Sequence, residues 1–476
     1  MSRDAEPAPL PMPPHNSTDW EKKNRYYHHL IERHLTFYTS GLDSLLVLGC
    51  GTGRIFQAVS ARACVGIDTR PAFIEAALEG ERNRRDVEFH HVEDYRSLPD
   101  LHRRFDTVVL YDVLAELTDI QAVLDALRRV MTPRSRLIFN YHSHLWSPVL
   151  RMAERLGLKR PTGETTWVTP EDASNFLSLS NYELVARERC MLLPKKMFGL
   201  GPVVNRWISP LPVINFFCLE NVVVARPVND TTGREAPTVT VVVPARNEAG
   251  TIDAVVRRLP SMGRHTELIF VEGHSTDGTW EAICRVQDAH PHLDIKTLKQ
   301  PGRGKADAVR YGCAEAGGDI LMILDADLTV APEELTKFYK AIVENKGEFV
   351  NGCRLVYPVE KQAMRFLNKV ANKLFGWLFT WLLGQRYRDT LCGTKALWKS
   401  DYDRIAAARE SLGDGDPFGD FDLIFGAARR GLKSIEVPIR YTGRTYGETN
   451  IRRFLHGLLL LRMSGSAARR LKFKRL

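Results

Sequence analysis

The feature that most constrains the fold is an apolar run, residues 320–324, which is followed by Asp325 and Asp327. Uninterrupted apolar residues predict a strand that is buried on both faces of a mostly parallel sheet. Alternate side chains of a strand point the same way, so both aspartates are expected to face one point beyond its carboxyl end. Open α/β sheets bind ligands there, and two hard carboxylates suit Mg²⁺ or Mn²⁺ shared with substrate phosphates. The alternative is that Asp327 caps a helix beginning near residue 331.

Length and composition predict a globular protein of two or three domains, because 476 residues exceed one ordinary core. The net charge of +9 fits a phosphate-rich ligand, an anionic membrane surface or nucleic acid. The 8 cysteines include no Cys-x-x-Cys pair, so neither a zinc site nor a disulfide framework is expected. Reduced thiols in a cytoplasmic protein are the plain interpretation.

Composition shifts along the chain predict its division. The proline-rich residues 1–18 are expected to be disordered and contain no signal peptide, and no apolar run is long enough to span a membrane. Residues 226–237 are polar and rich in turn formers, which indicates a linker between a domain at 19–225 and a second at 238–455. A basic tail at 456–476 follows.

Strands and helices alternate in the first domain, which predicts a doubly wound parallel sheet. A glycine-rich turn with Gly49, Gly51 and Gly53 follows the first strand, and it would let a ligand approach the backbone closely. Asp68 ends the second strand, where an acid can accept hydrogen bonds from a ribose. Asp94 follows the third strand.

This spacing over residues 20–225 resembles the class I S-adenosylmethionine-dependent methyltransferases. The resemblance implies that the three glycines line the methionine side of S-adenosyl-L-methionine, that Asp68 holds the ribose and that Asp94 lies near the adenine amine. Val47 stands where the family has an acid, so a domain that keeps the fold without methylating is the alternative. His142, His144 and Trp146 follow the fifth strand, where they would meet a methyl acceptor or be loop bystanders.

The second domain carries further polar groups at its predicted strand ends. In chain order these residues are Pro244, Asn247, Glu248, Glu272, Ser275, Asp277 and Lys305, ahead of Asp325 and Asp327. The turn at residues 302–305 lacks the spacing of a P-loop, although Arg303 and Lys305 can still contact a diphosphate.

Residues 238–455 resemble the inverting family 2 glycosyltransferases with the GT-A fold, most closely the branch of dolichol-phosphate mannose synthase and its bacterial polyprenyl-phosphate relatives. The resemblance implies that the residues just named bind a nucleotide sugar and that Asp325 and Asp327 bind the divalent ion. Glu272 stands where the family often has aspartate, and Thr329 where many relatives have glutamine.

The expected reaction displaces a nucleoside diphosphate from an anomeric carbon. An anionic lipid phosphate needs no strong protein base, but cationic side chains must hold it, and Arg354 and Arg444 are the candidates. A hydroxyl acceptor on a soluble molecule or a protein would need a base instead. Asp389, or Asp420 together with Asp422, would then serve.

Two segments predict contact with a membrane. Residues 362–383 alternate lysine and asparagine with tryptophan, leucine and phenylalanine at helical spacing, which suits either an interface helix or an ordinary buried amphipathic helix. Residues 451–476 are rich in arginine and lysine, which favours contact with anionic lipid. Nucleic acid is the rival partner for such a tail, but the sequence contains no recognition motif for it. The sequence therefore predicts a peripheral protein on the inner face of the cell membrane, or else a scaffold whose first domain only senses a cofactor or binds a partner.

Overall fold

The computed structural model describes residues 23–39, 42–59, 61–81, 84–156, 167–228, 235–357, 366–408, 419–447 and 453–473. The chain divides into two compact units, one built mainly from residues up to Pro227 and the other mainly from Val228 onward. The segment 1–18, which was expected to be disordered, lies outside the described residues, and so do residues 229–234 of the predicted linker.

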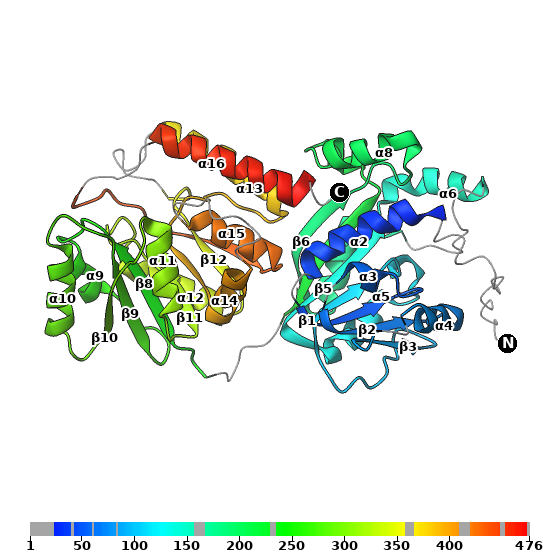
Figure 1. Ribbon diagram of the computed structural model, residues 1–476, viewed down its shortest axis with the longest axis horizontal. Coiled ribbons are helices and arrows are strands. Elements are labelled where there is room, and N and C mark those ends of the chain that lie inside the picture. The colour runs from blue at the N-terminus through cyan, green and yellow to red at the C-terminus, as the bar shows by residue number, and fades with distance from the viewer. Residues whose placement is uncertain are drawn as a thin grey trace, which may run out of the picture. The chain divides into compact units, whose positions relative to one another are not determined.

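The N-terminal unit contains a seven-stranded sheet with the order β3-β2-β1-β4-β5-β7-β6 (Figure 1). The strands are β1 (Leu42–Leu48), β2 (Ala61–Asp68), β3 (Val87–His91), β4 (Phe105–Leu110), β5 (Met131–His142), β6 (Tyr182–Cys190) and β7 (Glu220–Pro227). Strands β1 to β5 pair in parallel, whereas β7 runs antiparallel to β5. The predicted doubly wound sheet is confirmed, and β1 and β4 form the point where the strand order reverses.

Helices connect these strands. They are α2 (Arg25–Thr39), α3 (Ile55–Ala58), α4 (Pro71–Gly80), α5 (Ile120–Leu127), α6 (Ser147–Arg155), α7 (Pro170–Leu179) and α8 (Leu200–Val203). The local sequence explains where some of them begin. Thr169 and Asp172 form a reciprocal capping box at α7, and the Asp119 carboxylate accepts a hydrogen bond from the Ala122 amide, 2.9 Å away, at α5.

The C-terminal unit contains a second seven-stranded sheet, with the order β10-β9-β8-β11-β13-β12-β14. Its strands are β8 (Val239–Ala245), β9 (Thr266–Glu272), β10 (Asp294–Lys299), β11 (Ile320–Ile323), β12 (Phe349–Cys353), β13 (Lys395–Trp398) and β14 (Ser434–Pro438). Strand β11 is buried along its whole length, as its apolar run predicted. It pairs in parallel with β8, which pairs in parallel with β9, so the carboxyl ends of all three strands meet at one edge.

Helices connect or follow the strands of this unit. They are α9 (Ile252–Arg258), α10 (Thr279–Ala289), α11 (Lys305–Ala314), α12 (Leu335–Val343), α13 (Phe366–Leu383), α14 (Lys399–Ala407), α15 (Asp420–Arg429) and α16 (Arg453–Ala468). Val241 and Val243 belong to a core cluster with residues of α9, α10 and α12. Val242 points to the other face, where a Cβ on Gly312 of α11 would come within 2.9 Å of Val271 and closer still to Val242. Alternation along β8 thus places helices on two sides.

The sequence did not indicate strand β13 or strand β14 of this sheet, and β13 has the unexpected direction. It runs antiparallel to both of its neighbours, β11 and β12. Because β13 runs in the opposite direction to β11, it begins at the edge of the sheet where β11 ends. The residues just before Lys395 therefore reach the edge that carries the carboxyl ends of β8, β9 and β11. The sheet is therefore mostly parallel, as predicted, with β13 as its antiparallel strand.

Candidate functional site

The loops after β8 and β9 bring most of the predicted nucleotide-sugar residues together. The Asn247 amide donates to the Ser275 hydroxyl over 3.1 Å, and the Asn247 side chain accepts from the Thr276 amide over 2.8 Å. Asp277 accepts from the Ala249 amide, and Glu272 accepts from the Ser275 amide. Asn247 has a left-handed backbone with φ of 57°. The side chains of these two loops together form the surface, here called the rim, on which a nucleotide would rest. Pro244, half-buried, ends the same strand.

The two aspartates after β11 each carry an ion pair. Asp325 pairs with Lys305, and Asp327 lies 2.9 Å from Nη2 of Arg444. The Lys305 ammonium holds the pKa of Asp325 below its ordinary value although burial alone would raise it. Thr329, two residues after Asp327, donates its hydroxyl to Asp327 over 2.8 Å. Asp327 does not cap a helix, because the Pro332–Glu334 turn that follows has Ala331 at its N-cap position.

Glu248 completes this acidic rim. Its Oε1 accepts from Nη1 of Arg444 over 2.7 Å, whereas its buried Oε2 has no hydrogen-bond partner among the described residues. Burial, together with the nearby Asp327 and Asp277 carboxylates, raises the pKa of Glu248 to about 7, against the lowering effect of Arg444. The positive charges of Arg444 and Lys305 thus neutralise carboxylates that a divalent cation would also neutralise. Among the described residues, no three acidic, histidine or cysteine side chains come together as a metal site, so a divalent ion here would need Asp325 and Asp327 together with substrate phosphates.

Replacing Arg444 by methionine is expected to raise the pKa of Glu248 further above 7, because the guanidinium charge and its hydrogen bond are lost. Carbon-13 NMR of labelled glutamate carboxyls across a pH titration measures this pKa. Arg257→Met is the matched control, since Arg257 is 66% exposed and pairs with Asp253 on the same helix. A Glu248 pKa that stays the same or falls in Arg444→Met would contradict the electrostatic assignment.

Arg354 and Asp389 form a buried pair beside this rim. Nε and Nη2 of Arg354 donate to the two carboxylate oxygens of Asp389 over 2.7 and 2.8 Å, and the Asp389 side chain is fully buried. Burial would raise the pKa of Asp389, but Arg354 holds it below its ordinary value. Both oxygens are engaged, so the geometry suits Asp389 to position Arg354 and not to act as a base. Asp420 and Asp422 are similarly paired, 2.8 Å from Lys395 and 3.0 Å from Arg310.

Two residues that sequence reasoning missed lie under the aspartates. The Lys395 side chain is fully buried and pairs with Asp420. A Cβ on Gly393 would collide with the Asp325 carboxylate and the Lys305 ammonium, so only glycine leaves room for that ion pair. Thr394 separates Gly393 from Lys395, and no local pattern shows that a lysine at the start of a short strand is buried.

In the N-terminal unit, the glycine-rich turn joins β1 to α3. Gly49, Gly51 and Gly53 have φ angles of 77°, 55° and 80°. A Cβ on Gly49 would lie 2.6 Å from the carbonyl oxygen of Tyr111 and closer still to the Val113 side chain. The turn therefore packs against the end of β4 with no room for a side chain, a cradle that fits close approach of a cofactor to the backbone.

Two acids were predicted to touch the cofactor, and each is engaged by an arginine two residues later. Asp68 is fully buried, accepts from the Gly51 amide over 3.0 Å, and pairs with Nε of Arg70 at 2.8 Å. Asp94 accepts from Nε of Arg96 over 2.7 Å, which lowers its pKa. Asp68 thus fixes the glycine turn, and a ribose would share it with Arg70. Val47 is fully buried inside β1.

Gly49→Ala is expected to abolish binding of S-adenosylmethionine and to destabilise the N-terminal unit by about 1–3 kcal/mol, because the new methyl group meets backbone at a positive φ. Isothermal calorimetry measures the binding, and thermal unfolding measures the stability. Gly80→Ala in α4 is the matched control, since a Cβ there meets nothing within 4 Å. Tight binding by the Gly49 variant would show that the turn does not hold the cofactor.

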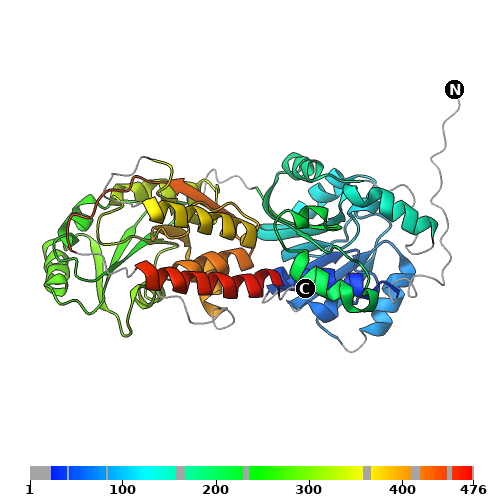
Figure 2. The same cartoon turned by 90° about the horizontal axis from the view of Figure 1, so that it is seen from above.

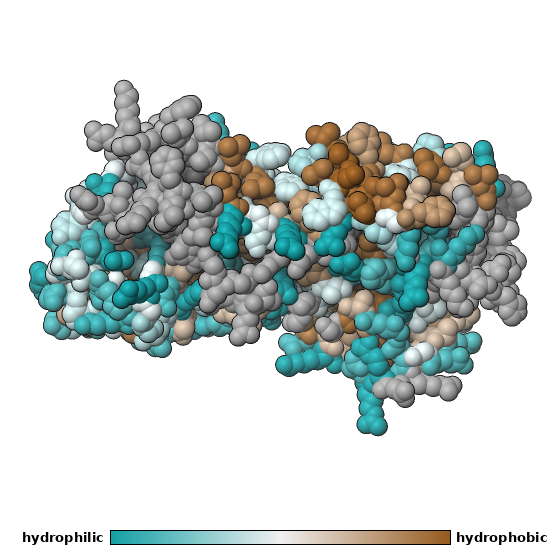
Figure 3. All heavy atoms as spheres, turned by 45° about the horizontal axis from the view of Figure 1, so that its top comes forward, coloured by the Kyte–Doolittle hydropathy of each residue, from teal (hydrophilic) through white to brown (hydrophobic). Residues whose placement is uncertain are grey.

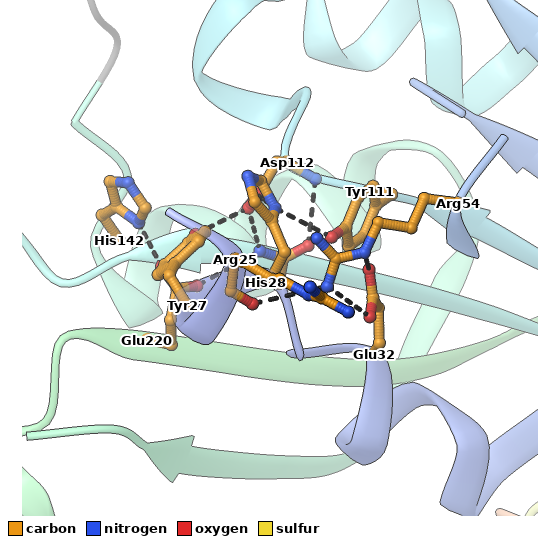
Figure 4. Close-up of polar contacts among 10 residues, drawn as sticks. Arg25, Tyr27, His28, Glu32, Arg54, Tyr111, Asp112, His142 and Glu220 are labelled. Atoms are coloured by element: carbon orange, nitrogen blue, oxygen red, sulfur yellow. Dashed lines mark hydrogen bonds and ion pairs between the residues drawn. The ribbon is translucent and has the colours of Figure 1, made fainter. Parts of the chain in front are cut away.

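A polar cluster lies next to the glycine turn, at the carboxyl ends of β4, β5 and the start of β7 (Figure 4). The Tyr27 hydroxyl lies 2.9 Å from Asp112 and 2.9 Å from Glu220, and it donates its single proton to one or the other carboxylate. His142 contacts Glu220 through Nδ1, and Asn140 donates to Glu220 over 3.2 Å. Burial and the two carboxylates raise the pKa of Tyr27 well above its ordinary value, so Tyr27 remains a hydrogen-bond donor.

The members of the cluster differ in exposure. Glu220 is fully buried, whereas the side chain of His142 is 27% exposed. Glu220 accepts from Nδ1 of His142, which fixes the orientation of the imidazole ring. Asp112 holds a left-handed backbone with φ of 55°, an arrangement that costs free energy and is frequent at functional sites. His142 was considered from the sequence, but Tyr27 and Glu220 lie far apart along the chain and no local pattern connects them.

Helix α2 closes over both features. Arg54, which directly follows the glycine turn, lies with its Nε 3.2 Å from Glu32 of α2. His28 of the same helix lies with its Nδ1 3.0 Å from the Tyr111 hydroxyl (Figure 4). The turn and the cluster are therefore held by one helix.

Comparison with known proteins identifies the two domains. Residues 46–137 match a family model described as methyltransferase domain, and residues 240–399 match one described as glycosyl transferase family 2. Glycosyltransferase AglJ of Haloferax volcanii is 29% identical over 215 residues, which are 45% of this chain and 66% of the relative. Dolichol-phosphate mannosyltransferase of Pyrococcus furiosus is 26% identical over 222 residues, 45% of this chain and 59% of the relative.

A third relative, undecaprenyl-phosphate mannosyltransferase of Micrococcus luteus, is 27% identical over 223 residues, 44% of this chain and 86% of the relative. The chain thus spans no more than about two thirds of the length of the first two relatives. A solved structure of magnesium protoporphyrin IX methyltransferase from Synechocystis is 17% identical, covers 44% of this chain and 86% of that one, and has a TM-score of 0.32. The family matches and the two sheets show that the chain contains a methyltransferase domain followed by a glycosyltransferase family 2 domain.

Proposed function

We propose that the C-terminal domain is a metal-dependent, inverting glycosyltransferase that moves a hexose from a nucleotide sugar to a polyprenyl phosphate. The observation that carries this proposal is the rim formed by Asp325, Asp327 and Glu248 at the ends of parallel strands, with Lys305 and Arg444 against it. Two relatives of this chain are named as mannosyltransferases of dolichol phosphate and undecaprenyl phosphate, which supports a lipid phosphate as the acceptor.

Acidic and basic residues have different roles in the proposed reaction. Asp325 and Asp327 would hold Mg²⁺ or Mn²⁺, which supplies positive charge to the departing diphosphate. Pro244, Asn247, Glu248, Glu272, Ser275 and Asp277 form the rim for the nucleotide, and Lys305 and Arg444 add cations beside its phosphates. The acceptor oxygen forms the new bond to the anomeric carbon from the face opposite the leaving diphosphate. That diphosphate takes the electron pair of the broken bond.

A lipid phosphate acceptor fits these contacts better than a hydroxyl acceptor. Its oxygen is already anionic, so the transfer needs a cation to hold it and no strong base. Arg354 provides that cation, fixed by Asp389. The three carboxylates considered as bases, Asp389, Asp420 and Asp422, are all paired with lysine or arginine.

The N-terminal domain is proposed to transfer a methyl group from S-adenosyl-L-methionine. Gly49, Gly51 and Gly53 would approach the cofactor through their backbone, with Asp68 and Asp94 near its ribose and adenine. The cofactor supplies an electrophilic methyl group when it is bound. His142 would accept the proton that the methyl acceptor loses, with Glu220 and Tyr27 fixing its position. Failure to bind the cofactor would favour the alternative of a sensing or scaffolding domain.

The C-terminal domain is proposed to lie against the inner face of the cell membrane. In the described part of the chain, no helix combines the length and the hydropathy that crossing a bilayer requires. Helix α13 buries Phe379 against Phe421 of α15, while Leu374 is 64% and Trp377 61% exposed. Figures 1 and 2 show α16 alongside α13 in this unit. An amphipathic helix with an exposed tryptophan suits the interface of a bilayer. Residues 362–365 of the predicted segment lie outside the described residues.

The test is a transfer assay in detergent with undecaprenyl phosphate as the acceptor and a panel of nucleotide hexoses as donors. A hexosyl lipid is expected with Mg²⁺ or Mn²⁺, and none after chelation with EDTA. A product that forms equally well after chelation would contradict the metal dependence. Transfer only to soluble or protein hydroxyls would contradict the lipid acceptor. Calorimetry with S-adenosylmethionine tests the N-terminal domain separately.

A further inference from the structure

Residues 197–217 of the N-terminal unit, between β6 and β7, bury polar side chains and expose apolar ones. Asn205 and Ser209, one helical turn apart, are fully buried. The Asn205 side chain accepts from the Leu192 and Leu193 amides over 2.8 and 3.0 Å. The exposed apolar residues, here called the apolar surface, are Met197, Phe198, Leu200, Val203, Trp207, Ile208, Leu211, Val213, Phe216 and Phe217. A helix that faces water has the opposite pattern, so this segment is built for an apolar partner.

Three residues of the apolar surface have backbone conformations that are unfavourable in free energy. Met197, Phe198 and Val213 have positive φ angles of 43°, 55° and 69°. Phe198 is completely exposed, and Val213 is 79% exposed. A left-handed conformation is unfavourable for these residue types, above all for β-branched valine, and such strain clusters at functional sites. Figure 3 shows apolar residues gathered in one area over the position of α8 in Figure 1.

The charges around the apolar surface select one kind of partner. Residues 191–219 contain Lys195, Lys196 and Arg206 and no acidic residue. The Arg206 guanidinium lies 5.5 Å from the centre of the Trp207 ring. Aromatic and aliphatic side chains bordered by cations fit a bilayer with anionic headgroups. A second copy of this chain would place cations against cations if the same surfaces met.

The same segment is tied to the polar cluster. The Ser143 amide, directly after His142, donates to the Leu219 carbonyl over 2.7 Å, and Glu220 follows Leu219 in the chain. The Asn205 side chain donates to the Tyr26 hydroxyl over 3.1 Å, and Tyr26 precedes Tyr27 on α2. A molecule held at the apolar surface is thus held by the elements that position the cluster.

We propose that the apolar surface docks the N-terminal unit on an anionic lipid bilayer and that the methyl acceptor is an amphiphile presented from that bilayer. The docking is carried by the geometry above, whereas the statement about the acceptor rests on the proposed methyltransferase function. The reacting group of the amphiphile reaches His142, and its apolar portion stays with the lipid.

The test is flotation of the full chain with vesicles of equimolar phosphatidylcholine and phosphatidylglycerol. Phe198→Asp combined with Trp207→Asp is expected to weaken vesicle binding by at least about tenfold, because apolar contacts are lost and negative charge is added. The matched control is Leu78→Asp with Leu179→Asp, which adds the same charge at residues that are 52% and 54% exposed in α4 and α7. Circular dichroism and calorimetry with S-adenosylmethionine check that both variants fold.

An equal loss in both double variants, or no loss in the Phe198 and Trp207 variant, would overturn the proposal. Brominated lipids give a second readout. They are expected to quench the tryptophan fluorescence of the native chain more strongly than that of Trp207→Phe, and equal quenching would contradict insertion at this surface. Light scattering tests the rival occupant: a dimer that the Phe198 and Trp207 variant dissociates, with vesicle binding unchanged, refutes the lipid assignment. None of these measurements uses sugar or methyl transfer, so their failure is distinct from failure of the proposed function.

Discussion

Asp327→Ala is expected to slow hexose transfer to undecaprenyl phosphate by about 10²- to 10³-fold, because the departing diphosphate loses the positive charge that this carboxylate helps to hold. The assay is the initial rate in detergent at saturating nucleotide sugar and Mn²⁺. Electron paramagnetic resonance measures Mn²⁺ binding, which is expected to weaken in parallel.

Asp253→Ala is the matched control for this experiment. Asp253 is a carboxylate of the same unit that is 52% exposed and pairs with Arg257 on its own helix. Its replacement is expected to leave the transfer rate within about twofold, since an exposed pair of this kind contributes little. Undiminished turnover in Asp327→Ala would remove the metal role from this residue and with it the main support for the proposed sugar transfer.

Asp389→Ala is expected to destabilise the C-terminal unit by about 3–5 kcal/mol, because Arg354 stays charged and would lose a carboxylate that contacts it twice. Hydrogen exchange of the β12 and β13 amides measures this change in the free energy of opening. Asp403→Ala is the control, since Asp403 is 54% exposed and pairs with Lys399 one turn away.

A second variant separates the structural role of the pair from its role in transfer. Arg354→Met combined with Asp389→Leu replaces the pair by apolar side chains and is expected to recover most of the lost stability. Sugar transfer should still be lost, because the cation proposed to hold the lipid phosphate is gone. Full activity in this folded variant would refute the role of Arg354.

The sequence predicted those features that depend on residues close together in the chain. The apolar run of β11 and the glycine turn at Gly49 were identifiable because their strand or turn chemistry is local. The antiparallel strand β13 was missed, since four residues carry no periodicity that separates a strand from a loop. The predicted metal role of Asp327 remains a prediction.

Which side chains pair inside the fold was beyond sequence reasoning. Arg70 follows Asp68 closely, but nothing in the sequence shows that the two side chains pair inside the unit. Tyr27 and Glu220 are separated by 193 positions and meet only because α2 lies over the ends of β4 and β7. Buried charge such as Lys395 is likewise decided by tertiary contacts, here with Asp420.

The antiparallel course of β13 separates two kinds of specificity along the chain. Every side chain proposed for the nucleotide apart from Arg444 precedes residue 328, whereas Arg354 and Asp389, proposed for the acceptor, come later, after β12 and on the approach to β13. Under the proposed function, substitution of Arg354 or Asp389 would alter the use of the acceptor while the earlier residues keep the choice of donor. Donor and acceptor preferences in this architecture are therefore free to diverge one at a time.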